Sequence, residues 1–248
     1  MRKVAIAVSM LIALAAIAGG ASWWRHRSAR PVDVALYFHP FVGPDRLTFN
    51  EARYPNPGGE GRYKVRDFQF FLSNLKLTGE SGEYREPDSY HLVRFDGAEP
   101  VFVIVLRGVP RGDYRRIEFG IGVDAAANTS LTQHGDLDPN GRMAWTWEVG
   151  YKFVLFEGTL ERGDTSIPLV YHVGFAENYA PVSIELEAGS VKDRAARLNF
   201  GVDISRLFRG AATVDMAALP SVKFDRADAK LIARNMPGMI TLMRTAVP

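Results

Sequence analysis

Apolar and polar side chains alternate with a period of two along residues 32–39. One side of this segment carries the apolar residues Val32, Val34, Leu36 and Phe38. The opposite side carries Asp33, Ala35, Tyr37 and His39, which are mostly polar. Such alternation is typical of a half-buried β-strand. Eight further segments rich in β-branched and aromatic residues follow, at residues 68–77, 90–95, 101–106, 116–123, 152–161, 167–175, 182–188 and 196–204. The pattern therefore predicts about nine strands.

Short turn-forming sequences separate the predicted strands. Examples are Asn-Pro-Gly-Gly at 56–59, Gly-Asp at 112–113 and Arg-Gly-Asp at 162–164. Successive strands leave no room for the long helical crossover that a parallel β-α-β unit needs. The chain is therefore predicted to have an all-β fold, a two-layer antiparallel Greek-key β-sandwich.

Two segments depart from the strand pattern. Residues 124–146 are polar and rich in turn formers, which predicts a long excursion at one end of the sandwich, where function tends to reside. Residues 225–243 place apolar side chains on one helical face, which predicts a C-terminal helix that Pro237 kinks or splits. The sequence contains no internal repeat or linker, so residues 31–248 are predicted to form a single domain.

The first 30 residues have the pattern of a targeting segment. Arg2 and Lys3 precede an uninterrupted run of apolar and small residues at 4–21, which fits a secretory signal. The same run is nearly long enough to span a bilayer, with Trp23 and Trp24 at the interface. Residues 1–30 are therefore predicted to be a signal peptide or an N-terminal membrane anchor with a basic flank. The rest of the chain is expected in the periplasm, with membrane contact only through residues 4–21.

Composition excludes several classes of protein. The chain has no cysteine, which rules out disulfides, iron–sulfur clusters, thiolate zinc sites and cysteine catalysis. The net charge of +2 comes from the leader, because residues 1–30 hold five of the 30 basic residues and none of the 28 acidic ones. The remainder is slightly acidic, so no surface for nucleic acid is expected. Catalytic-triad and phosphate-loop motifs are also missing from the sequence, and the chain is predicted not to be an enzyme.

Three of the five histidines fall on predicted strands and are the candidate metal ligands: His39, His91 and His172. If these strands converge, the imidazoles could share an ion of copper, zinc, iron or nickel. The alternative is that each histidine is an isolated, hydrogen-bonded strand residue. The sequence contains no local His-x-His pair, which would have favoured a shared metal site over isolated histidines.

The excursion at 124–146 contains two further candidates. Asp136, Asp138 and Asn140 match the opening of an EF-hand calcium loop, but its twelfth position is Trp147, where the bidentate glutamate is required. An Asx-rich turn without tight calcium binding is therefore expected. Met143, Trp145 and Trp147 alternate as on a strand face, which favours core packing and leaves a ligand or redox role open.

Several motifs in the same order resemble the MbnP-like family, which consists of exported proteins of methanobactin operons and their relatives. In the first half of the chain they are Phe-His-Pro-Phe-Val-Gly at 38–43, Tyr-Pro-Asn-Pro-Gly-Gly at 54–59, Phe-Phe-Leu-Ser-Asn-Leu-Lys-Leu at 70–77 and Gly-Val-Asp at 122–124. In the second half they are Gly-Asp-Leu-Asp-Pro at 135–139, Met-Ala-Trp-Thr-Trp at 143–147, Gly-Tyr-Lys-Phe at 150–153 and Tyr-His-Val-Gly at 171–174. The resemblance covers nearly all of residues 32–245.

The resemblance implies a β-sandwich that binds copper, as Cu(I) or Cu(II), through a pair of histidines on neighbouring strands. His39 matches the first of the pair, His91 is the candidate for the second by position, and His172 lies in a family motif of its own. The family's oxidisable tryptophan is expected two residues before the first histidine, where this chain has Tyr37. Conversion to kynurenine by a partner di-haem protein of the cytochrome c peroxidase type would therefore have to fall on Trp145 or Trp147.

The sequence thus supports three hypotheses of function. The first is an exported copper-binding protein that captures or hands over copper through a histidine pair. The second is a redox partner or substrate of a di-haem cytochrome c peroxidase-like protein. The third is a structural domain whose metal site has degenerated.

Overall fold

The computed structural model describes residues 30–51, 53–80, 82–95, 100–130, 133–146, 150–189, 191 and 195–243. The predicted leader lies outside the described residues, apart from Arg30, and so does Trp147. No helix in the described part of the chain is long and apolar enough to cross a membrane.

All nine predicted strands are present, most of them longer than predicted. The strands are β1 (Val32–Val42), β2 (Asp45–Arg46), β3 (Tyr54–Pro55), β4 (Arg62–Gly79), β5 (Gly82–Arg85), β6 (Tyr90–Arg94), β7 (Phe102–Val109), β8 (Tyr114–Ile121), β9 (Ala144–Thr146), β10 (Gly150–Arg162), β11 (Thr165–Gly174), β12 (Ala180–Glu185), β13 (Ala195–Asp203), β14 (Ser221–Val222) and β15 (Ile240–Leu242). The helices are α2 (Ala125–Asn128) and α3 (Arg226–Ala233), with 3-10 turns η1 (Gly135–Leu137), η2 (Ala176–Asn178), η3 (Ile204–Leu207) and η4 (Met236–Met239).

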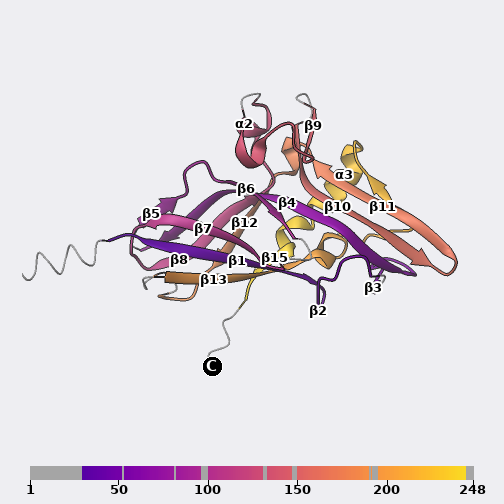
Figure 1. Cartoon of the computed structure of the whole chain (residues 1–248), viewed down its shortest axis with the longest axis horizontal. Coiled ribbons are helices and arrows are strands. Elements are labelled where there is room, and N and C mark those ends of the chain that lie inside the picture. The colour runs from indigo at the N-terminus through magenta and orange to yellow at the C-terminus, as the bar shows by residue number, and fades with distance from the viewer. Residues whose placement is uncertain are drawn as a thin grey trace, which may run out of the picture.

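The strands form two sheets (Figure 1). The five-stranded sheet has the order β15-β13-β1-β2, and β7 also pairs with β1. The ten-stranded sheet has the order β12-β8-β4-β10-β11-β14, with β3, β5 and β6 on the long strand β4 and β9 on β10. The all-β sandwich is therefore confirmed. The prediction of wholly antiparallel sheets is wrong in two places, because β1 pairs in parallel with β13 and β11 with β14.

The alternation of β1 places its apolar side in the core between the sheets. Val34, Leu36 and Phe38 are fully buried. The Phe38 ring stacks on that of Phe200 from β13, with centroids 5.3 Å apart. Burial of the even-numbered side chains directs the odd-numbered ones to the opposite face of the sheet. This alternation fixes the direction of His39.

The excursion at residues 124–146 covers part of the ten-stranded sheet. Asp124 caps α2 by accepting hydrogen bonds from the backbone N–H groups of Ala126 and Ala127. A second apolar cluster forms beneath the excursion and includes Phe71, Val123, Leu137, Met143, Tyr151, Phe153 and Leu155. Strand β10 is consequently buried on both faces at residues 151–156. Figure 1 shows α2 and β9 together at this end of the molecule.

The C-terminal helix is shorter than residues 225–243. Asp225 caps α3, which ends at Ala233, and Pro237 lies in the separate turn η4. Residues 240–242 then form β15, which pairs with β13. The predicted interruption at Pro237 is confirmed, whereas the helical assignment of residues 240–242 is wrong. Their pairing with a distant strand overrides the local helical pattern.

Candidate metal centre

His39 lies on the outer face of the five-stranded sheet. It shares this face with Tyr37 and Phe41, and its side chain is half-buried. Its Nε2 lies 3.0 Å from Oδ1 of Asn199 on the adjacent strand β13. A carboxamide oxygen only accepts hydrogen bonds, so Nε2–H donates and Nδ1 carries the free lone pair. A hydrogen bond on one ring nitrogen is the usual way in which a metal-binding imidazole is oriented.

His91 lies in β6, which pairs with β4 of the ten-stranded sheet. Its Nε2 donates to Oε2 of Glu86 at 2.7 Å, and the Ser89 hydroxyl donates to the same oxygen at 2.6 Å. Because β1 pairs with β13, β7 and β2, the strands that carry His39 and His91 are not hydrogen-bonded neighbours.

His172 lies in β11 and belongs to a network of charges around Glu157. Its Nε2 is 3.1 Å from Oε1 of Glu157, whose other oxygen lies 2.7 Å from Arg66 and 2.8 Å from Arg142. Burial alone would raise the pKa of Glu157, but the hydrogen bonds from Arg66, His172 and Arg142 lower it to about 2. Burial lowers the pKa of His172, against the opposing effect of Glu157. At neutral pH, His172 is therefore uncharged and donates a hydrogen bond to the charged carboxylate of Glu157.

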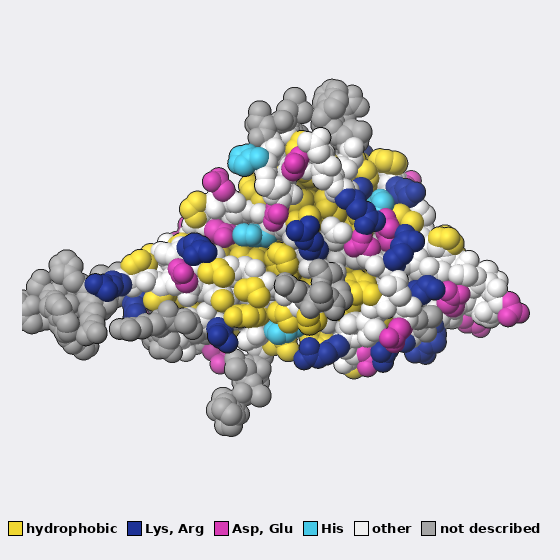
Figure 2. Space-filling view, viewed as in Figure 1, with side chains coloured by type: hydrophobic (Ala, Val, Ile, Leu, Met, Phe, Trp, Pro, Cys, Tyr) yellow, Lys and Arg dark blue, Asp and Glu magenta, His cyan; other side chains and the backbone are white. Residues whose placement is uncertain are grey.

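Each candidate histidine thus has a hydrogen-bond partner of its own. Among the residues the structure describes, no three His, Asp or Glu side chains are grouped to hold a metal ion. On the face drawn in Figure 2, the histidine side chains lie apart from one another. A single ion shared by His39 and His91, with help from His172, remains a prediction.

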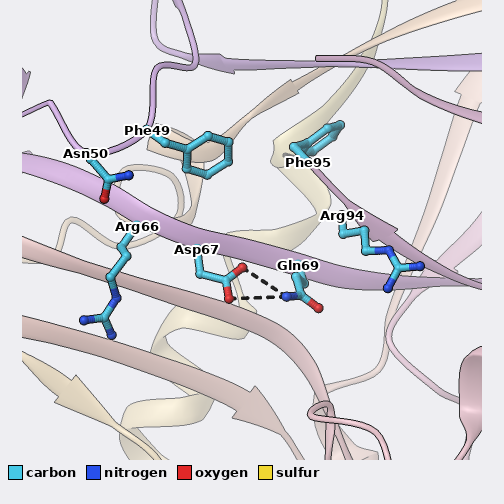
Figure 3. A pocket seen from close by; sticks show the side chains of 7 residues that line it. All are labelled: Phe49, Asn50, Arg66, Asp67, Gln69, Arg94 and Phe95. Carbon is cyan, nitrogen blue, oxygen red and sulfur yellow. Dashed lines mark hydrogen bonds between the residues drawn. The ribbon is translucent and has the colours of Figure 1, made fainter. Parts of the chain in front are cut away.

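A pocket of about 420 Å³ lies beside the network around Glu157 and was not anticipated from the sequence. It is lined by Phe49, Asn50, Arg66, Asp67, Gln69, Arg94 and Phe95. Figure 3 shows the two phenylalanine rings above β4 and the two arginines at opposite ends of the pocket. Asp67 accepts a hydrogen bond from Gln69 at 3.0 Å and is also bound by Arg142. The lining contains no histidine, so it offers aromatic surface and guanidinium groups and no imidazole ligand.

The residues that resemble an EF-hand loop have structural roles. Oδ2 of Asp136 accepts the backbone N–H of Leu92 at 2.8 Å, which ties the excursion to β6. Oδ1 of Asp138 accepts from both the backbone and the side chain of Asn140 at 2.9 Å. This arrangement is the expected Asx turn.

Trp145 packs in an aromatic cluster at the same end of the molecule. Its ring centroid is 5.4 Å from that of Phe175 and 5.3 Å from that of Phe224. Phe224 is 62% exposed, which is unusual for a side chain of this size. The cluster therefore joins a half-buried tryptophan to the protein surface.

Comparisons with known proteins identify one family. The family model for MbnP matches residues 31–224. Among solved structures, MbnP from Methylosinus trichosporium is similar, with a TM-score of 0.49 and 16% sequence identity over 75% of this chain and 86% of that chain. A comparison with curated proteins finds no match.

Proposed function

Because the chain belongs to the MbnP family, we propose that it is an exported copper-binding protein. It captures or hands over copper in the periplasm and is not an enzyme. Copper is the metal that the family resemblance implies, and His39 is its first ligand. In the histidine-pair form of the proposal, His91 supplies the second imidazole and His172 assists.

The observation that carries the proposal is the setting of His39. Leu36 and Phe38 supply the core packing of this part of β1, so the histidine on the opposite face contributes nothing to the core. Its hydrogen bond to Asn199 orients the ring and leaves Nδ1 as the free acceptor. Imidazole nitrogen is a good ligand for copper, and without cysteine no thiolate of this chain competes for the ion.

A copper titration of single-site variants tests this proposal. We expect His39→Ala to weaken Cu(I) binding roughly tenfold or more, since even the loss of a residue that only orients a ligand typically costs about 10- to 100-fold. Affinity is measured against a competing chelator of known strength, with His91→Ala and His172→Ala alongside. His134→Ala serves as the matched control, because His134 lies outside the three candidates. Wild-type affinity in both His39→Ala and His91→Ala would reject the histidine pair, and absence of copper binding by the wild type would favour a structural domain.

The aromatic cluster around Trp145 favours a second candidate function, that of a redox partner or substrate of a di-haem protein. The ring of Phe224 contacts that of Trp145 in a tilted arrangement and is itself exposed, so a docked oxidant would meet an aromatic contact leading to the tryptophan. We expect protein recovered from the periplasmic fraction to carry an oxidation mass shift on the peptide with Trp145 and Trp147. The same spectrum shows whether residues 1–21 have been removed. An unmodified peptide from cells that express the di-haem protein would exclude this candidate.

A further inference from the structure

We infer that the pocket beside the network around Glu157 binds a small aromatic carboxylate, whose ring lies between Phe49 and Phe95 and whose carboxylate binds Arg94. The inference goes beyond the proposed function, because the pocket lining holds no histidine and the ligand needs no metal. The volume of about 420 Å³ lies within the range of small-molecule sites. It is large enough for one ring system and its acid group.

The pocket occupies a gap in one edge of the long strand β4. Strand β10 pairs with the opposite edge, where it faces both Val65 and Gln69. The edge with the gap therefore pairs with Phe49, which forms an isolated bridge to Val65, and with β6, whose Arg94 pairs with Gln69. Between these two positions no strand in the described part of the chain covers this edge. The open length is roughly 13 Å, since an extended strand rises about 3.3 Å per residue.

The backbone at Asn50 directs the chain away from the gap. Its N–H donates to the carbonyl oxygen of Val65 at 2.8 Å, and its φ of 64° is left-handed. Asparagine tolerates this conformation better than most residues. The bridge at Val65 is parallel, whereas Tyr54 pairs with Tyr63 in the antiparallel sense, so the chain reverses its direction between them. The reversal leads away from the pocket and leaves the edge of β4 open.

Two phenylalanine rings form the apolar sides of the gap (Figure 3). Phe95 is 5% exposed, and its ring lies nearly parallel to that of the fully buried Phe68, with centroids 6.4 Å apart. Phe49 is half-buried and packs against the same core. Both rings are thus held in place by the core before any ligand binds. Aromatic walls of this kind favour a flat aromatic ring between them.

The charges around the pocket leave one positive group without a counter-ion. Arg66 pairs with Glu157, and Arg142 binds both Glu157 and Asp67, so two arginines balance two carboxylates. The side chain of Arg94 is exposed and makes no ion pair or hydrogen bond with the residues that the structure describes. The site therefore has an excess of one positive charge, which suits a monoanion. A guanidinium binds a carboxylate through two parallel hydrogen bonds.

The order of Arg94 and Phe95 in the chain matches a ligand with one polar and one apolar end. Consecutive side chains of a strand point to opposite faces. Phe95 is directed to the core beside Phe68, so Arg94 lies on the outer face, together with Gln69, its partner on β4. A ligand that enters from the outer face therefore brings its ring to the phenylalanines and leaves its carboxylate at Arg94.

Calorimetric titration of the full chain with 2-naphthoate tests the inference. We expect the wild type to bind this probe and Arg94→Gln to bind it roughly tenfold or more weakly, because a hydrogen bond to a charged group is lost. Phe49→Leu keeps apolar bulk but removes the aromatic face, and should weaken binding about two- to tenfold. Arg107→Gln is the matched control, since the Arg107 side chain is 82% exposed and lies outside the pocket lining. It should bind like the wild type.

Three other outcomes would contradict the inference. The first is absence of 2-naphthoate binding at millimolar concentration, and the second is equal affinity in the wild type and Arg94→Gln. The third is equal affinity of the wild type for the neutral analogue 2-naphthamide, which would exclude the contact between carboxylate and guanidinium. His39→Ala should bind 2-naphthoate like the wild type, so that failure of the proposed copper site and failure of this pocket are observed separately.

Discussion

Replacing Phe156 with alanine is expected to lower the free energy of unfolding by about 3–5 kcal/mol. Phe156 is fully buried in β10 and lies at the centre of an aromatic cluster. Its ring centroid is 5.0 Å from that of Phe208, 5.8 Å from Tyr171 and 6.0 Å from Tyr63. Truncation removes the transfer free energy of the ring and leaves a cavity that three rigid rings cannot close. Urea unfolding measures the loss as a lower transition midpoint, with the dependence of the free energy of unfolding on urea concentration unchanged.

Phe224→Ala is the matched control for this prediction. Phe224 is 62% exposed and contacts Trp145 alone among the aromatic pairs described. Its truncation should cost no more than about 1.5 kcal/mol, which is the upper range for one aromatic pair. Equal losses in the two variants would show that the cluster around Phe156 is not a main source of stability.

Glu157→Gln is expected to lower the free energy of unfolding by about 2–3 kcal/mol at neutral pH. The carboxylate is 13% exposed and binds Arg66, Arg142 and His172. Glutamine keeps the volume but removes the charge that these donors share, so the carboxylate of Asp67 is the one partner left to Arg142 and the ion pair of Arg66 is lost. Glu185→Gln is the control, because the pair of Glu185 with Arg116 is exposed and such pairs contribute about 0–1 kcal/mol.

The carboxylate of Glu157 also predicts that the free energy of unfolding falls as the pH is lowered. The pKa of Glu157 is about 2 in the folded protein against an ordinary value of 4.5. A lowered pKa stabilises the folded state above 4.5, and this stabilisation is lost as the pH falls from 4.5 toward 2. Unfolding curves across this range should show a smaller loss for Glu157→Gln than for the wild type. Parallel curves for the two proteins would contradict the assignment.

The sequence by itself determined nine of the strands and the direction of His39. Alternation in residues 32–39 follows from the backbone geometry of a strand, in which successive side chains point to opposite faces. It therefore identified the buried side with Phe38 and the outer side with His39 without any knowledge of partners. Pro237 interrupted the C-terminal helix for an equally local reason, since its ring excludes it from a helix interior. The family followed from motifs in their order along the chain.

Only the tertiary structure decided which strands are neighbours, and with them the composition of the candidate site. The parallel pairing of β1 with β13 joins residues 162 positions apart, and the rest of the domain serves as the crossover. That pairing sets Gly201 beside His39 and brings the side chain of Asn199 to its ring nitrogen. Glu157 acquires its two arginines and His172 in the same way, from three separate segments. Such contacts depend on which apolar faces pack together across the whole chain, and no local pattern of residues contains that information.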